Sequence, residues 1–395
     1  MPLALSDSYP LPAVNLTFYM NSVHINTDIR SRKVVYTDNL PGYRLDPGID
    51  MKQQLQDLLD KTVGAAPGAM LAVHAPLLGL DWSGAAGVSS LERGNPLTTQ
   101  HSFRIASMSK TFTGVLVAQL LERQQLALSD PIAAYLSEKL LAQIPVAHGH
   151  VVGELTIEQL LQHRAGFNDF ATSQEWVMEI AKDPGRPRTP MEIISWALAH
   201  TEILGAPGET YRYSDTGYVL LGILLEKLTG TPYWQLCRER IFDPLDMGGT
   251  WLEGYEEPRN ELSHPYVVMN GQYIDALQIH GSVDWAGGGH VSTLEDIGRF
   301  LRGVFNCHLF NEIDTLDRFL TGPEASANYF YAMGVGRKQI RGKHLWGHLG
   351  HWGSFMSYCP EQRLSLCGTL NYDQAAHNDF IAEVLKVVFP DTCEA

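Results

Sequence analysis

The sequence predicts an α/β (α+β) fold in which an antiparallel sheet is flanked by helices from the two ends of the chain and a mainly helical domain is inserted. Three observations support this expectation. Short β-like runs occur near residues 68–87 and again near 355–370, and amphipathic helices flank both sets of strands. Between residue 107 and about residue 242 the pattern is dominantly helical. We therefore expect one sheet that both ends of the chain build together.

The first elements follow from turn and capping signals. Residues 1–48 form an irregular leader that ends in the turn-rich Asp46-Pro47-Gly48. Asp50 can cap the helix that follows, in which apolar side chains recur at helical spacing: Met51, Leu55, Leu58 and Leu59. Two β-like runs come next, over residues 68–75 and 80–87, and they supply the first strands of the sheet.

The rest of the chain alternates between helical and extended patterns. Near the C-terminus, residues 355–358 and 364–370 form a hairpin, and an amphipathic helix that Pro390 stops comes last. These patterns predict three parts: a leader at residues 1–48, a sheet domain from residues 49–105 plus 285–395, and a mainly helical inserted domain at residues 106–284.

Length and composition favour a globular protein with an acidic surface. The 395 residues are enough for two cores, or for one large core with an inserted lobe. Hydrophobic residues make up 45% of the chain and charged residues 18%, which argues against disorder. The net charge of -15 repels nucleic-acid phosphates and anionic lipid headgroups. We therefore expect neither a nucleic-acid partner nor a membrane partner.

The cysteines and the first residues bear on the compartment. The five cysteines have no Cys-x-x-Cys spacing, and we expect them to stay reduced, including Cys359 and Cys367, which flank a predicted hairpin turn. The N-terminus lacks the basic start and the unbroken apolar stretch of a signal peptide. No window approaches the roughly 18 apolar residues that a membrane span requires. These features favour a cytoplasmic protein.

Ser107 and Lys110 form the first candidate catalytic pair. If Ser107 opens a helix, the residue three positions later lies on the same face, so the Lys110 amine comes within reach of the serine hydroxyl. An amine can take the proton of a serine and so make it a nucleophile. The start of a helix also offers free backbone N–H groups for the charge that develops on an attacked carbonyl oxygen. An isolated Ser-x-x-Lys more often reflects a capping serine and a solvated lysine, so support must come from other segments.

Two later segments supply that support. Tyr213-Ser214-Asp215 precedes a strongly helical run, and His348-Leu349-Gly350 precedes the C-terminal hairpin. Together with Ser107-x-x-Lys110, these elements resemble, in order, the motifs of the serine β-lactamase and penicillin-binding protein family. The resemblance is strongest to the branch that contains class C β-lactamases, D-alanyl-D-alanine carboxypeptidases, D-aminopeptidases and related esterases.

Framework stretches extend the resemblance over about residues 50 to 390. They are residues 126–131, 160–166 and 286–293. The resemblance implies a β-lactamase-like fold, with the active site in a cleft between the sheet and the inserted helical domain.

The resemblance also implies a role for each matched residue. Ser107 would attack the substrate carbonyl, and Lys110, Tyr213 or both together would accept its proton, with Tyr213 placed to pass it to the leaving group. His348 would lie across the cleft as a donor or as a group that tunes the charge on Tyr213. The backbone N–H groups of Ser107 and His351 would form the oxyanion hole.

Two positions depart from the family pattern. Leu349 stands where family members that bind a free carboxylate often have a hydroxyl, which favours a neutral ester or amide over a β-lactam or a D-alanyl-D-alanine terminus. Asp215 stands where the family usually has an asparagine. Its carboxylate can pair with Lys110 and shift the base role toward Tyr213, or it can bind a substrate ammonium. The sequence leaves both alternatives open.

Other candidate residues concern the substrate, metals and cofactors. We expect five residues to lie beside the substrate: Trp285, Trp352, Gly350, Asp215 and Leu349. The spacing of His344, His348 and His351 could suggest a metal cluster, but the glycines between them argue against the helix that would align them. The glycines at 287–289 are not followed by the Gly-Lys-Ser/Thr of a phosphate loop. We expect no metal and no cofactor.

The sequence therefore predicts a serine hydrolase that cleaves a small carboxylic ester or amide through a Ser107 acyl-enzyme. One alternative is a β-lactamase, a D-alanyl-D-alanine carboxypeptidase or a D-aminopeptidase. Another is a catalytically silent binding or scaffold protein of the same fold, although such a protein has no physical need for Ser107, Lys110 and Tyr213 together. The oligomeric state is not predicted.

Overall fold

The structure is a computed structural model that describes residues 18–20, 23–28, 33–36, 50–144, 154–200 and 202–390. It comprises two compact units, residues 1–49 and residues 50–395. In the first unit, three antiparallel strands form a sheet in the order β1-β2-β3: β1 (Phe18–Met20), β2 (Val23–Asp28) and β3 (Lys33–Tyr36). The sequence prediction assigned no regular structure to this leader, and the three strands correct it.

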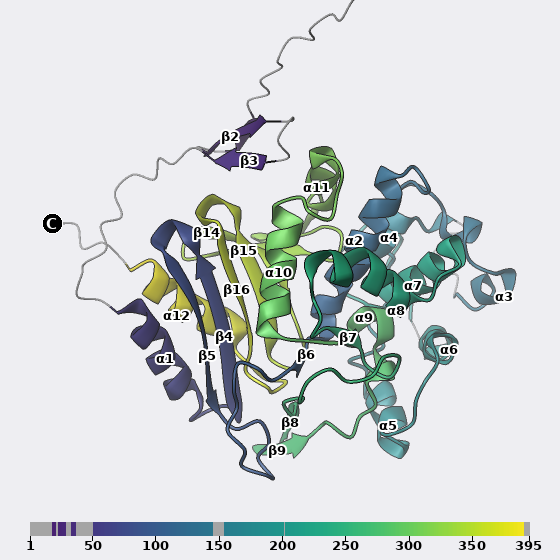
Figure 1. Cartoon of the computed structure of the whole chain (residues 1–395). Coiled ribbons are helices and arrows are strands. Elements are labelled where there is room, and N and C mark those ends of the chain that lie inside the picture. The colour runs from purple at the N-terminus through teal and green to yellow at the C-terminus, as the bar shows by residue number, and fades with distance from the viewer. Residues whose placement is uncertain are drawn as a thin grey trace, which may run out of the picture. The chain divides into compact units, whose positions relative to one another are not determined.

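An eight-stranded antiparallel sheet forms the centre of the second unit (Figure 1), in the order β11-β12-β13-β14-β15-β16-β4-β5. Its strands are β4 (Gly68–Ala75), β5 (Leu80–Gly87), β11 (Glu324–Ser326), β12 (Tyr329–Tyr331), β13 (Gly336–Ile340), β14 (Lys343–Leu349), β15 (Ser354–Cys359) and β16 (Leu364–Thr369). Strand β4 pairs with β16, with Met70 opposite Thr369. Strands from both ends of the unit therefore share one sheet, as the sequence predicts.

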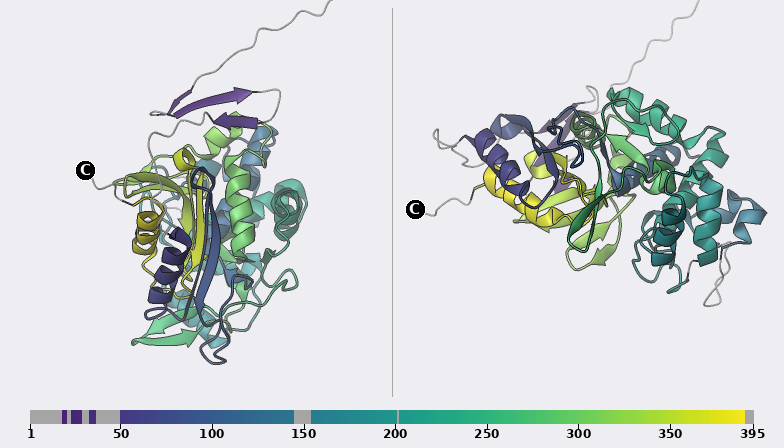
Figure 2. Two further views of the ribbon diagram at one scale, coloured as in Figure 1. Left: turned by 60° about the vertical axis from the view of Figure 1, so that its left-hand side comes forward. Right: turned by 90° about the horizontal axis from the view of Figure 1, so that it is seen from below.

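The sheet has two apolar faces because successive side chains of a strand point to opposite sides. Leu71 and Leu366 belong to a buried cluster that includes side chains of α1 (Met51–Thr62) and α12 (His377–Val388). Their neighbours Met70 and Cys367 belong to a second, larger cluster. Helices α1 and α12 cover the first face, and α10 (Leu294–Phe305) packs on the other against β4, β15 and β16 (Figures 1 and 2).

The larger cluster joins the sheet to a group of helices that pack on the α10 side. These are α2 (Ser109–Glu122), α3 (Glu138–Leu141), α4 (Ile157–Leu161), α5 (Gln174–Lys182), α6 (Pro190–His200), α7 (Asp215–Thr229), α8 (Tyr233–Cys237), α9 (Trp285–Gly288) and α11 (Ile313–Phe319). Several begin with a capping side chain: Thr156 and Gln159 form a capping box at α4, and Ser173 caps α5.

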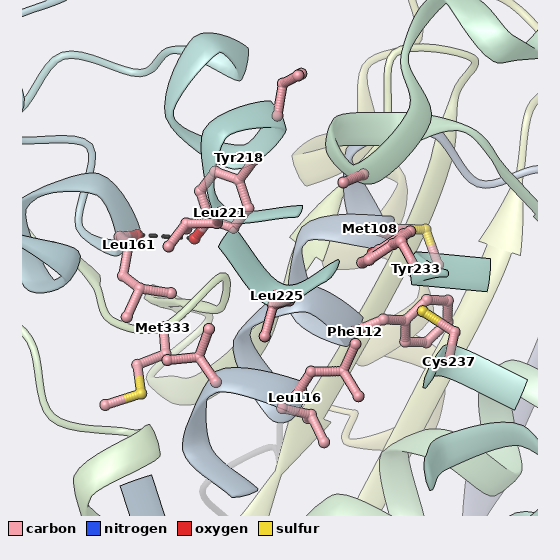
Figure 3. Packing of buried hydrophobic residues seen from close by; sticks show 14 of the residues in the cluster. Met108, Phe112, Leu116, Leu161, Tyr218, Leu221, Leu225, Tyr233, Cys237 and Met333 are labelled. Carbon is pink, nitrogen blue, oxygen red and sulfur yellow. Dashed lines mark hydrogen bonds between the residues drawn. The ribbon is translucent and has the colours of Figure 1, made fainter. Parts of the chain in front are cut away.

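Helix α2 is the centre of this region and is buried on all sides from Ser109 to Leu120. Met108, Phe112 and Leu116 are spaced by one turn and pack among side chains of α7 and α8, as Figure 3 shows. A helix without a polar face belongs in the interior of a domain. The first turn of α2 is therefore held rigidly from every direction.

Two smaller sheets bring the remaining segments to the start of α2. The first has the strand order β6-β10-β7, with β6 (Phe103–Arg104), β10 (His290–Ser292) and β7 (Trp251–Leu252). The second is a hairpin of β8 (Tyr266–Met269) and β9 (Gln272–Asp275). The backbone N–H of Ile105 donates to the carbonyl of His290. This pairing sets the chain just before Ser107 beside the chain just after α9.

Several predictions about local structure are confirmed. The strands at residues 68–75 and 80–87 have the predicted bounds, and Asp50 caps α1 by accepting from the backbone N–H of Lys52. The described cysteines are free: Cys237, Cys307, Cys359 and Cys367. Among the helices that the structure describes, none combines the length and the apolar character that crossing a bilayer requires. The division of residues 49–395 into a sheet domain and an inserted domain stays a prediction.

Candidate active site

Ser107 lies in a single 3₁₀ turn, Ala106–Met108, that leads directly into α2. Ala106 has a left-handed backbone with φ of 47°, which is strained for a residue with a Cβ. This residue lies between β6 and α2, and Ser107, which follows it, remains partly exposed. Partial exposure at the end of a buried helix is the setting that a nucleophile needs.

Lys110 is completely buried, with 0% of its side chain exposed, and its amine has three polar neighbours. Nζ donates to Ser107 Oγ at 3.0 Å and to the carbonyl oxygen of Gly287 at 2.7 Å. It also lies 2.5 Å from Asp215 Oδ1. Three acceptors match the three donor directions of a lysine amine. The amine is therefore fixed in one position beside the serine hydroxyl.

Asp215 is the first residue of α7, and its carboxylate faces Lys110 rather than solvent. The backbone N–H of Asp215 donates to Asp169 Oδ1 at 3.0 Å, so a second carboxylate stands behind it. Burial raises the pKa of Asp215 to about 7, against the opposing effect of the Lys110 charge and with a further increase from Asp169. This carboxylate changes its protonation near neutral pH.

Tyr213 approaches the same point from the segment before α7. Its ring lies over Lys110 Nζ, 4.9 Å from the ring centre, and packs on the His163 ring with centroids 4.3 Å apart. The phenol oxygen is buried and makes no hydrogen bond of ordinary geometry with a described residue, although the Ser107 hydroxyl interacts with it. Burial, reinforced by the charge of Asp215, raises the pKa of Tyr213 well above its usual value. Tyr213 therefore keeps its proton at neutral pH.

His348 lies on β14 across from Tyr213, with ring centroids 6.2 Å apart. Its Nε2 shares a hydrogen bond of 2.9 Å with the Tyr331 hydroxyl, and its Nδ1 lies 2.7 Å from the carbonyl oxygen of Leu349. Burial, together with the nearby charge of Lys110, lowers the pKa of His348 to about 3. The imidazole is neutral at physiological pH, donates one hydrogen bond and carries no positive charge into the site.

Two backbone N–H groups are candidates for the oxyanion hole. That of Ser107 lies in the first turn of a helix, where backbone donors have no acceptor within the helix. That of His351 follows β14, and no acceptor for it is found in the described part of the chain. A side-chain carbon at Gly350 would lie 2.4 Å from the carbonyl oxygen of Ile105, so only glycine lets this end of β14 approach the Ser107 turn. Gly350 thus brings the two donors to the same side of the site.

Of the residues that the sequence assigned to the substrate, Leu349 and Trp285 pack into core clusters, whereas Trp352 lies beside the Ser107 turn. Leu349 packs against the cluster on the α1 and α12 face, because it follows His348 in the strand and points to the other side of the sheet. Trp285 is 1% exposed and packs on Tyr233 and Gly222 inside the larger cluster. Both side chains therefore pack against the apolar clusters of the domain. Trp352 packs on Ala106, directly before the nucleophile.

Sequence reasoning missed the partners that come from distant segments. The carbonyl of Gly287 receives Lys110, the Tyr331 hydroxyl holds His348, and the His163 ring supports Tyr213. The stretches around Gly287 and His163 were recognised as framework, which was the only available signal for them. Nothing in the local sequence marks Tyr331, since an aromatic residue in a strand is common.

The three histidines considered for a metal do not meet in the described part of the chain. His348 is buried on β14, while His344 and His351 are exposed. Within the described residues, the group close enough to share a metal ion is a different one: Glu92, His264 and Asp275. His264 Nδ1 already pairs with Asp275 Oδ2 at 2.7 Å there.

Comparisons with known proteins identify relatives of this chain. A family model described as Beta-lactamase matches residues 55–386. The beta-lactamase of Escherichia coli K12 is 25% identical over 256 residues, which span 63% of this chain and 61% of that enzyme, so the chain covers less than two thirds of that relative. Two solved structures resemble this chain equally well. They are a D-stereospecific amidohydrolase from Streptomyces sp. and the D-amino acid amidase of Ochrobactrum anthropi SV3 in complex with D-phenylalanine. Each superposes with a TM-score of 0.74 and 25% sequence identity, over 86% of this chain and 99% of its own length.

Proposed function

Because the chain belongs to the beta-lactamase family of hydrolases, we propose that it hydrolyses small carboxylic esters or amides through an acyl-enzyme on Ser107. The observation that carries the proposal is the contact of 3.0 Å between Lys110 Nζ and Ser107 Oγ at a partly exposed turn. A hydroxyl and a buried amine at this distance form the pair that nucleophilic catalysis requires. The backbone N–H groups of Ser107 and His351 would stabilise the oxyanion.

Lys110 and Asp215 together act as the base. As Ser107 Oγ bonds to the substrate carbonyl carbon, Lys110 Nζ takes the hydroxyl proton and hands one of its own to Asp215 Oδ1, 2.5 Å away. The proton of the serine thus ends on Asp215, and the amine keeps its proton count. A carboxylate with a pKa of about 7 is a suitable acceptor at neutral pH.

Tyr213 acts as the acid. Its raised pKa keeps the phenol protonated, so it can donate to the departing alkoxide or amine as the tetrahedral intermediate collapses. In deacylation the resulting phenolate takes a proton from water, the hydroxide attacks the acyl carbon, and the proton stored on Asp215 returns through Lys110 to Ser107. Every proton is back in place after one turnover.

Charges around the site favour an uncharged or cationic substrate over an anionic one. Lys110 is paired with Asp215, and His348 is neutral, so neither of these two described residues offers a free positive charge to a substrate carboxylate. Leu349, on the opposite face of the sheet, supplies no donor either. These features support an ester or amide without a carboxylate next to the scissile bond, in preference to a β-lactam.

Labelling and turnover test the proposal together. A fluorophosphonate probe should modify Ser107, and p-nitrophenyl butyrate should be hydrolysed. Ser107→Ala should abolish both signals, whereas Ser137→Ala, which removes a capping serine at the start of α3, should leave both intact. A probe adduct at another residue, or full turnover by the Ser107→Ala protein, would remove the basis of the proposal. Nitrocefin turnover as fast as ester turnover would favour a β-lactamase instead.

A further inference from the structure

We propose that Asp284 binds the ammonium group of the substrate, so that the enzyme prefers amino-acid esters and amides that carry a free amine. This inference rests on the proposed hydrolysis at Ser107 and names the class of substrate. It concerns a residue that neither the proton transfers nor the oxyanion hole uses.

Asp284 carries a carboxylate that has no partner among the described residues. It precedes α9 and occupies the N-cap position, where an aspartate ordinarily accepts from backbone N–H groups. Here the side chain makes no capping hydrogen bond, and the N–H groups of Gly287 and Gly288 bond to the backbone oxygen of Asp284. The carboxylate is half-buried, and this burial raises its pKa. A desolvated carboxylate without a donor is a site for a cation.

The carboxylate lies next to the nucleophile. A side-chain carbon at Gly288 would lie 3.4 Å from both the Asp284 carboxyl carbon and the carbonyl carbon of Ala106, so these two atoms flank the same small gap. Ala106 is bonded directly to Ser107. On this inference, an amine on the α-carbon of an acyl group held on Ser107 comes within reach of the carboxylate.

Within the described parts of the chain, no cationic side chain pairs directly with this carboxylate. The charges that stabilise the Asp284 carboxylate from a distance are those of His351, Lys110 and Arg104, while Asp169 opposes them. Lys110 is held by Asp215, and His351 is exposed. Arg104 forms a two-pronged ion pair with Glu253, with hydrogen bonds of 2.8 Å, and donates to the carbonyl of Ala276. The Asp284 carboxyl group therefore has no paired cation among these residues, and an incoming ammonium can take that place.

Asp169 and Asp215 already have partners and are therefore not free to bind a substrate ammonium. Asp169 accepts from the backbone N–H of Asp215 and from the Thr172 hydroxyl, so it fixes the start of α7. Asp215 is occupied by Lys110. Because Asp215 is paired with Lys110, it is not free to bind a substrate ammonium, and Asp284 is the carboxylate to which this inference assigns that role.

Matched substrates test the inference. We would compare kcat/KM for alanine p-nitroanilide, in both configurations, with kcat/KM for its N-acetyl derivative. The free amine should be preferred by roughly 10-fold to 100-fold, the effect of one hydrogen bond to a charged group. The preference should disappear above about pH 8, where an α-amino group loses its proton. Asp284→Asn should abolish the preference and Asp284→Glu should retain part of it.

Two controls separate this inference from the proposed function. Asp57→Asn removes the same charge from α1, on the opposite face of the sheet, and should leave the preference unchanged. Turnover of p-nitrophenyl butyrate reports on Ser107 independently of any amine. Ester turnover without a preference for the free amine, or a preference that survives in Asp284→Asn, would overturn the role of Asp284 alone. Absence of both ester turnover and labelling at Ser107 would instead overturn the proposed function.

Discussion

Replacing Asp215 by asparagine tests the shared base directly. Asparagine has nearly the same shape and keeps an oxygen toward Lys110 Nζ, which remains bonded to Ser107 and to the Gly287 carbonyl. The substitution removes the ability to hold a proton together with the negative charge beside Lys110. Loss of general-base assistance typically lowers a rate by roughly 10²-fold to 10⁴-fold, and the lower figure corresponds to ~2.7 kcal/mol of transition-state stabilisation. We expect kcat for p-nitrophenyl butyrate to fall by about 10²-fold.

The pH profile adds a second, independent measurement. The wild-type rate requires the Asp215 carboxylate, whose pKa is about 7. About one tenth of the molecules therefore carry it at pH 6 and about nine tenths at pH 8, so kcat/KM should rise about tenfold across this interval. Asp215→Asn should lack this rise. Asp169→Asn is the matched control, because removing its charge should lower the pKa at Asp215 and move the rise to lower pH while the plateau persists.

One pair of results would refute the shared base. If Asp215→Asn retains kcat within about threefold and keeps the same rise between pH 6 and pH 8, the carboxylate neither accepts the proton nor sets the profile. Lys110 would then act as the base without the carboxylate. Circular dichroism and thermal unfolding of the variant must accompany the kinetics, because the buried Lys110 loses its charged partner.

Three further predictions follow from other parts of the structure. Tyr213→Phe should lower kcat for an alkyl amide by about 10²-fold but should affect a p-nitrophenyl ester much less, because p-nitrophenolate departs without protonation. Equal losses of kcat on both substrates would contradict the role of Tyr213 as the acid. Gly350→Ala should lower both the melting temperature and the labelling rate of Ser107, because its Cβ would lie 2.1 Å from Ser354 Oγ and 2.4 Å from the Ile105 carbonyl oxygen. Gly248→Ala is the control: a Cβ there meets no atom within 4 Å, so both measurements should stay unchanged. His290 is buried, and neither of its ring nitrogens has a hydrogen-bond partner among the described residues. Burial lowers its pKa to about 3, so its contribution to stability is present above pH 6.5 and is lost as the pH falls toward 3. His290→Leu should therefore shift the acid-unfolding midpoint, followed by fluorescence, to lower pH.

The parts of the fold that sequence could predict are those in which one local signal suffices. The strands at 68–75 and 80–87 are bounded by glycines and turns. Successive side chains alternate between the two faces of the sheet, so Leu71 belongs to the apolar cluster on one face and Met70 to the cluster on the other. Helix α1 begins where Asp50 can cap it. The Ser107 and Lys110 pair was equally accessible, because three residues along a helix fix which side chains can meet.

The sequence could not predict the direction of individual side chains or their contacts with distant segments, for physical reasons. Leu349 was assigned to the substrate by its place in a motif, but a strand turns alternate residues to opposite faces, and His348 already takes the inner one. Trp285 was assigned by its chemistry, but its ring fills space above Gly222, a glycine far away in the sequence. No local rule relates Asp284 to Ala106, because their closeness depends on how α9 packs beside the Ser107 turn.

All three polar contacts of the Lys110 amine are made in the structure, which implies that the site and the helical region form together. The three partners of its amine come from three separate elements: the Ser107 turn, the start of α7 and the end of α9. These elements also pack on one another around α2. A buried amine that lacks any one partner carries an uncompensated desolvation cost of several kcal/mol. A state in which α7 or α9 is detached therefore exposes Lys110 to water and loses both the base and its acceptor at once. Catalytic activity should disappear in step with the tertiary packing of these helices, not before it and not after it.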